Sequence, residues 1–137
     1  QALPLYRALA AATAAGLLRS AHTPTLGGLA AAAALCALAG NRGAELELAA
    51  APGADKLPAT AAGDDALLFS ESNSRFLVTC APDRAAELEA HFANLPCARL
   101  GTVAAAPTLT LRRGARALVH TPLEPLRKAF KKTLAGI

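Results

Sequence analysis

Residues 20–29 (SAHTPTLGGL) have residue types and spacing that could bind an anion. Pro24 and the pair Gly27 and Gly28 predict a sharp turn between a short extended segment and an alanine-rich helix. A strand that leads through a glycine turn into a helix points backbone N–H groups at one place, where a phosphate can bind. The Thr25 hydroxyl would add a donor. The same glycines also suit an ordinary tight turn, so a purely structural role is the alternative.

Glu71 and Arg75 form a second candidate site, because they lie four residues apart around a Ser-Asn-Ser segment. An ion pair between them would fix the start of the following strand. Alternatively, the guanidinium of Arg75 would hold a phosphate or carboxylate through two hydrogen bonds. His22 is a weak candidate for a catalytic side chain, since the sequence identifies no partner for it. A structural histidine is the alternative there.

The sequence lacks the short motifs by which a chain binds nucleotides or activates a nucleophile by itself. It has no G-x-x-x-x-G-K-[ST] loop, no G-x-S-x-G turn and no H-E-x-x-H pair. Cys36, Cys80 and Cys97 are odd in number and widely spaced, without a C-x-x-C pair. We therefore expect reduced, mostly buried thiols and no metal site.

Three separated motifs carry a resemblance to a known family. They are S-A-H-x-x-x-x-G-G-L at 20–29, A-G-x-x-G-A-E-L at 39–46 and L-F-S-E-S-N-S-R-F at 68–76. In this order and spacing they resemble the C-terminal domain of phosphoribosylformylglycinamidine synthase, synthetase subunit type. That family belongs to the superfamily of aminoimidazole ribonucleotide synthetase and selenophosphate synthetase. The resemblance extends from about Tyr6 to Val103, and more loosely to the end of the chain.

The resemblance implies one part of an ATP- and glutamine-dependent ligase of de novo purine biosynthesis. Such an enzyme converts formylglycinamide ribonucleotide to formylglycinamidine ribonucleotide. ATP activates the formamide oxygen as an iminophosphate, and ammonia then displaces phosphate. The N-terminal domain of the same protein would supply most ligands for ATP and Mg²⁺, and a glutaminase subunit or domain would supply ammonia. A homodimer and a cytoplasmic location are further expectations. This domain alone would bind neither ATP nor Mg²⁺ and would be inactive.

The resemblance also implies which residues face the substrate. The expected substrate-binding residues come from the glycine turn and the Glu-Ser-x-x-Arg segment: Thr25, Gly27, Gly28, Glu71 and Arg75.

Three positions depart from the family pattern. Thr23 and Leu26 replace the two aspartates of the usual His-Asp-Val-Ser-Asp-Gly-Gly turn, and Leu35 stands where a glutamate is expected in the next helix. The loss of these charges motivates a second hypothesis, a non-catalytic interaction or scaffold domain of the same fold. The equivalent domain of another superfamily member is a further alternative.

Length and composition predict one domain with a core of small apolar side chains. The chain has 137 residues, of which 53% are hydrophobic but only 4% aromatic. The absence of Met and the start at Gln1 suggest a piece of a longer protein. A net charge of +4 with so few aromatic residues argues against a nucleic-acid partner. The longest apolar run, residues 29–39, is about half of the ~20 residues that span a membrane, so no membrane segment is expected.

The periodicity predicts an α+β fold with a mixed sheet and helical layers. The family resemblance implies the same fold, with a partly ferredoxin-like arrangement. We expect Asp64 and Asp65 to cap a short helix. Residues 75–80 have the character of a central strand. The segment 27–39 is apolar on all sides, which predicts an exposed apolar patch. The remaining expected elements are helices at 5–16, 82–95 and from Pro122 after a Thr121 cap, and strands at 17–22, 44–48, 98–103, 108–111 and 117–119. The last helix should pack inward through Leu123, Leu126, Phe130 and Leu134.

Overall fold

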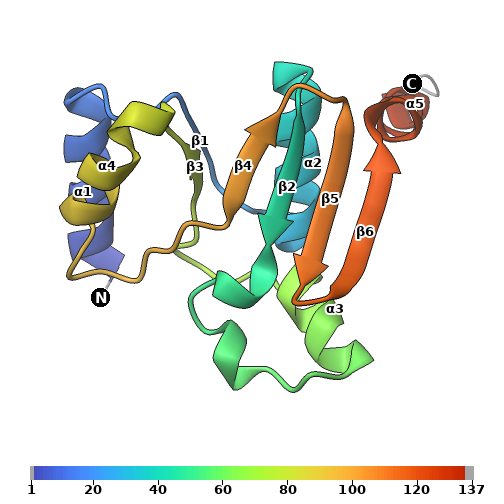
Figure 1. Cartoon of the computed structure of the whole chain (residues 1–137), viewed down its shortest axis with the longest axis horizontal. Helices are drawn as coiled ribbons and strands as arrows, with labels where there is room; N and C mark the ends of the chain where they lie inside the picture. Colours follow the sequence, from blue (N-terminus) through green and yellow to red (C-terminus); the bar gives the residue numbers. More distant parts are fainter. Residues whose placement is uncertain (1, 135–137) are drawn as a thin grey trace.

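A four-stranded mixed sheet forms the larger half of the molecule (Figure 1). The computed structural model describes residues 2–134, with side chains to Lys132. The strand order is β4-β2-β5-β6. Strand β2 runs antiparallel to β4 and parallel to β5, while β5 and β6 form an antiparallel hairpin. The strands are β2 (Gly43–Glu47), β4 (Gly101–Ala104), β5 (Thr108–Arg113) and β6 (Arg116–Pro122).

Three helices pack with this sheet around the main hydrophobic core. They are α2 (Gly28–Gly40), α3 (Ala61–Phe69) and α5 (Leu123–Leu134). Helix α2 contacts β2 and β5 and is itself contacted by α3 and α5. Leu48, Leu109, Leu111 and Leu123 are the largest fully buried side chains of this core. The expected α+β class, with a mixed sheet and helical layers, is therefore confirmed.

A smaller second lobe contains a two-stranded sheet and two helices, α1 (Ala2–Ala14) and α4 (Ala85–His91) (Figure 1). Strand β1 (Ser20–His22) pairs antiparallel with β3 (Leu77–Thr79). Ala12, Leu17, Leu88 and Phe92 form the small buried core of this lobe. Short 3₁₀ turns complete the chain: η1 (Leu48–Ala50) and η2 (Ala54–Lys56) follow β2, and η3 (Pro82–Arg84) precedes α4.

Strand β3 connects the two cores. Leu77 packs against the main core, whereas the next residue, Val78, packs against the core of the small lobe. Successive side chains of a strand point to opposite faces, so one short strand can serve both cores. The prediction of a central strand at residues 75–80 is wrong in its placement, because β3 pairs with β1 alone among the described strands.

The start of helix α3 also differs from the prediction. The helix begins at Ala61 and Thr60 is its cap, since the Gly63 N–H donates to the Thr60 hydroxyl at 3.4 Å. Asp64 lies within the helix and is 6% exposed. The interpretation of Asp64 and Asp65 as capping residues is therefore wrong.

Helix α2 is better covered than its composition suggested. No residue of α2 before Ala39 is exposed, although six are half-buried. The sheet, α3 and α5 contact it, so the expected exposed apolar patch is reduced to a half-buried face, which lines the cleft described below. At the end of the helix, Asn41 takes a left-handed conformation, and its N–H donates to the carbonyl oxygens of Ala37 and Leu38.

Helix α5 departs from the expected amphipathic packing at two places. Strand β6 extends through Pro122, so the helix begins at Leu123, without the Thr121 cap. Leu123 is buried but Phe130 is 52% exposed, so the inward-facing stripe stops short of Phe130. The side chain of Leu134, also expected inward, lies outside the described residues. Over the described part of the chain, no helix is long and apolar enough to cross a membrane.

Candidate functional site

The glycine turn before α2 has a conformation that only glycine adopts easily. Gly27 and Gly28 have φ of +80° and +60°. A Cβ on Gly27 would lie 2.7 Å from the Cβ of Ala31, and one on Gly28 would lie 2.6 Å from the carbonyl carbon of Phe69. Gly28 therefore lets the end of α3 contact the start of α2.

Both glycine amides are engaged within the chain. The Gly27 N–H donates to Oε1 of Glu71 at 2.9 Å, and the Gly28 N–H donates to the carbonyl oxygen of Thr25 at 3.2 Å. The anion at this turn is therefore the carboxylate of Glu71, which comes from 44 residues further along the chain. The side chain of Thr25 is exposed.

Arg75 lies beside this turn but does not pair with Glu71. One terminal nitrogen, Nη1, donates to the carbonyl oxygen and to the hydroxyl of Ser70, and Nη2 donates to the hydroxyl of Ser72; all three distances are 3.3 Å. Among the described residues, no carboxylate lies within ion-pair distance of Arg75. The predicted Glu71–Arg75 ion pair is therefore wrong, and the half-buried guanidinium has only neutral partners.

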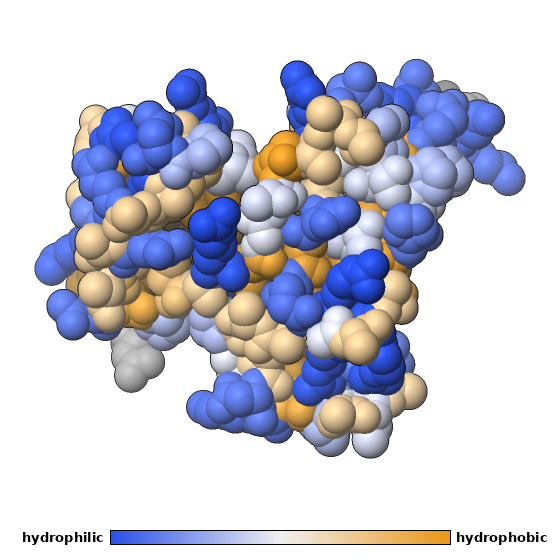
Figure 2. All heavy atoms as spheres, in the orientation of Figure 1, coloured by the Kyte–Doolittle hydropathy of each residue, from blue (hydrophilic) through white to orange (hydrophobic). Residues whose placement is uncertain are grey.

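A broad cleft separates the small lobe from the sheet and is visible as a notch in Figure 2. Both His22 and Arg75 line it, whereas Thr25, Gly27, Gly28 and Glu71 do not. His22 is half-buried on β1, opposite Leu77. The residues preceding β3 add a polar row of Ser70, Ser72, Asn73 and Ser74 to walls that are otherwise largely apolar.

The charge of the cleft is strongly one-sided. Among the described residues, Glu89 is the single acidic residue that lines it, whereas five basic residues do so: Arg42, Arg75, Arg99, Arg127 and Lys131. A concave surface with an excess of one sign of charge attracts ligands of the opposite sign. This arrangement suits a phosphate-bearing ligand.

The three positions where neutral residues replace the acidic residues of the family pattern add no negative charge to the cleft. Thr23 is exposed and Leu26 is 83% exposed, while Leu35 is half-buried and lines the cleft. No group of three or more His, Cys, Asp or Glu side chains that could hold a metal ion occurs in the part of the chain that the structure describes.

The cysteines also line the cleft, as free thiols. Cys36 and Cys80 are half-buried and Cys97 is exposed, so the expectation of mostly buried thiols is wrong. Burial raises the pKa of the Cys36 thiol. Burial, with a smaller contribution from the charge of Glu89, raises the pKa of the Cys97 thiol. A raised pKa lowers the fraction of thiolate, which is the nucleophilic form of cysteine, at a given pH.

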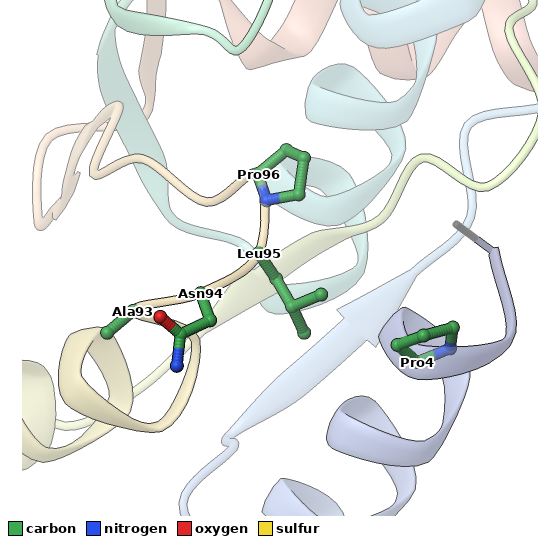
Figure 3. Close-up of a pocket in the computed structure, with 5 residues that line it drawn as sticks. All are labelled: Pro4, Ala93, Asn94, Leu95 and Pro96. Carbon is green, nitrogen blue, oxygen red and sulfur yellow. The ribbon is translucent and has the colours of Figure 1, made fainter.

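A smaller hollow lies between α1 and the segment after α4 (Figure 3). It is lined by Pro4, Ala93, Asn94, Leu95 and Pro96, none of which titrates. We assign no chemistry to it.

Sequence reasoning missed an ion cluster that joins α3 to the β5–β6 hairpin. Asp64 pairs with Arg113 at 2.9 Å and with Arg116 at 2.7 Å. The spacing of the two arginines around the hairpin turn at Gly114 was the available signal, but their partner lies about fifty residues away in sequence. The cluster lies outside the cleft lining and has a structural role.

Fold and sequence together define the class of the protein: an α+β domain with a mixed sheet, similar to known synthetase domains. Residues 2–114 match the family described as AIR synthase related protein, C-terminal domain, and the chain belongs to this family.

One relative of similar sequence and two solved structures of a second protein illustrate the relationship. Phosphoribosylformylglycinamidine synthase subunit PurL of Prochlorococcus marinus (strain MIT 9303) is 35% identical over 127 residues, which cover 87% of this chain and 15% of the relative. T. maritima PurL complexed with ATP superposes with a TM-score of 0.75 at 22% identity, over 89% of this chain and 21% of that protein. T. maritima PurL complexed with FGAR superposes with a TM-score of 0.71 at 21% identity, over 89% of this chain and 20% of that protein. The two structures confirm the fold, and this chain spans only a small part of each relative.

Proposed function

We propose that this chain is a single domain of a longer ATP-dependent C–N ligase and forms the substrate-facing wall of its cleft. The ligase converts formylglycinamide ribonucleotide to formylglycinamidine ribonucleotide in purine biosynthesis. The family membership supports this proposal, as does the name of the Prochlorococcus marinus relative. T. maritima PurL, which contains a domain of similar fold, is complexed with FGAR in one structure and with ATP in another.

The observation that carries the proposal is the guanidinium of Arg75. It lines the cleft, is half-buried and has no carboxylate partner among the described residues. A guanidinium can give two parallel hydrogen bonds to a phosphate, and such charge-assisted bonds are stronger than its contacts to neutral oxygens. Arg75 therefore binds an anionic group of the substrate, and Ser70 and Ser72 are released to hydrogen-bond the same group.

The other candidate residues have supporting roles in this proposal. Gly27 and Gly28 give the turn its shape, and the carboxylate of Glu71 accepts the hydrogen bond of the Gly27 N–H. Thr25 is exposed and lies outside the cleft lining, whereas His22 contributes an imidazole to the cleft wall. A direct contact of the glycine amides with substrate would first require their present partners to leave.

The remaining components of the reaction belong to other parts of the assembly. As the family relationship implies, we propose that an N-terminal domain of the same protein holds ATP and Mg²⁺, and that a glutaminase subunit or domain provides ammonia. We expect the complete enzyme to be cytoplasmic and to function as a dimer. The comparisons lend no support to the alternative of a scaffold domain.

A chimera tests the proposal directly. This chain would replace the matched segment of the Prochlorococcus marinus subunit, and FGAR-dependent release of phosphate from ATP would be measured with ammonia present. Turnover by the chimera is the expected result, with the parent subunit as control. A chimera that folds and assembles like the parent but shows no FGAR-dependent turnover would contradict the proposal.

A further inference from the structure

The loop between α3 and β3, residues 70–76, is held at both ends and along its length. Its start follows Phe69, whose backbone packs on Gly28. Glu71 then accepts the hydrogen bond from Gly27. Further along, the hydroxyl of Ser74, a residue with φ of +61°, lies 2.9 Å from the hydroxyl of Tyr6 on α1. The loop thus bridges the two lobes in a defined conformation at the wall of the cleft.

The contact between Glu71 and Gly27 decides which groups remain near Arg75. Glu71 is the acidic residue nearest to Arg75 in sequence, at a separation of four. Because its carboxylate is bound to the Gly27 amide, Arg75 turns to the oxygens of Ser70 and Ser72 instead. A carboxylate released from Gly27 would be free to pair with the guanidinium and cancel its charge.

The geometry of Gly27 makes this contact possible. Its φ of +80° presents the N–H at the edge of the turn, and Ala31 leaves no room for a side chain there. A carboxylate that accepts a backbone N–H at the start of a helix is also favoured by the helix dipole. The turn therefore has the means to retain Glu71 in competition with Arg75.

We propose that Glu71 is a positioning residue, whose bond to Gly27 keeps Arg75 without a counter-ion and available to an anion in the cleft. This inference rests on the proposed function of Arg75. It assigns the glycine turn an internal anion as its partner, in place of the substrate phosphate.

The test is a titration of this chain with inorganic phosphate. NMR signals of the Arg75 side-chain N–H groups and of the backbone amides of residues 70–76 report binding. Glu71→Gln keeps an acceptor for Gly27, so its phosphate affinity should match that of the unmodified chain. Glu71→Asp keeps the charge but is one methylene shorter, so the freed carboxylate should pair with Arg75. We expect Glu71→Asp to weaken phosphate binding by about fivefold, the order of an exposed ion pair.

Equal affinities of Glu71→Asp and the unmodified chain would overturn the inference. So would tighter binding by Glu71→Gln, because Glu71 would then act only by repelling anions. Arg75→Gln separates this inference from the proposed function. If Arg75→Gln leaves phosphate binding unchanged, the proposed role of Arg75 fails as well. If it abolishes binding while Glu71→Asp has no effect, only the positioning role of Glu71 is lost. Dispersed amide spectra of all variants would verify that they fold.

Discussion

The carboxylate of Asp64 lies 2.9 Å from the guanidinium of Arg113, and both side chains are almost completely buried, at 9% and 11% exposure. Arg113 also donates to the carbonyl oxygens of Pro58 and Leu57, at 2.8 and 2.7 Å. One guanidinium therefore joins α3, the segment before it and the β5–β6 hairpin. Arg116 adds a second, more exposed cation on Asp64.

Replacing Asp64 with Ala should lower the free energy of unfolding by about 3–5 kcal/mol, because Arg113 would stay buried without a counter-charge. Urea denaturation followed by circular dichroism measures this change. Glu87→Ala is the matched control, since the Arg84–Glu87 pair is solvent-exposed and should contribute little. Similar denaturation midpoints for Asp64→Ala and the unmodified chain would show that the cluster does not stabilise the fold.

Gly28→Ala should destabilise the chain far more than Gly16→Ala. Both glycines have positive φ, so both substitutions carry a backbone cost of about 1–2 kcal/mol. Only Gly28 adds a steric conflict, because its Cβ would meet the backbone of Leu68 and Phe69, whereas nothing lies within 4 Å of a Cβ on Gly16. The difference between their unfolding free energies isolates the contact of α2 with α3. Equal decreases in the free energy of unfolding for the two variants would mean that α2 and α3 can move apart at this point without loss of stability.

Elements whose signal is local could be predicted from the sequence. The alternation in β2 and in the β5–β6 hairpin, and the alanine-rich α2, appear where periodicity placed them. Such patterns depend on neighbours within a few residues. The assignment of β3 failed because an apolar β-prone run describes burial on both faces, not the identity of the neighbouring strands.

The candidate site shows the same limit more sharply. The motifs drew attention to Gly27, Glu71 and Arg75, but the expected ion pair was local, between Glu71 and Arg75. The fold brings Gly27 next to Glu71 across 44 residues, and the carboxylate binds the amide instead. Asp64 and Arg113 likewise meet only through tertiary packing. No periodicity in the sequence specifies such long-range partners.

Alkylation of Cys97 should require a higher pH than alkylation of an unperturbed cysteine, whose pKa is about 8.5. Burial and then Glu89 raise the pKa of Cys97, so less thiolate is present at any given pH. Peptide-level mass spectrometry after iodoacetamide pulses across a pH series gives the midpoint. Glu89→Gln should lower this midpoint only partly, because burial remains the larger cause. A midpoint at or below the ordinary value would contradict this description of the cleft wall.

The kinetics of Arg75→Gln in the chimera with the Prochlorococcus marinus subunit test the central claim most directly. Losing a hydrogen-bonded charge should lower kcat/KM for FGAR by about tenfold or more. Arg112→Gln is the control, since Arg112 is exposed on β5 and lies outside the cleft lining. We predict the large decrease for Arg75→Gln and none for Arg112→Gln. Equal kcat/KM values for the two variants would contradict the assignment of Arg75 to the substrate.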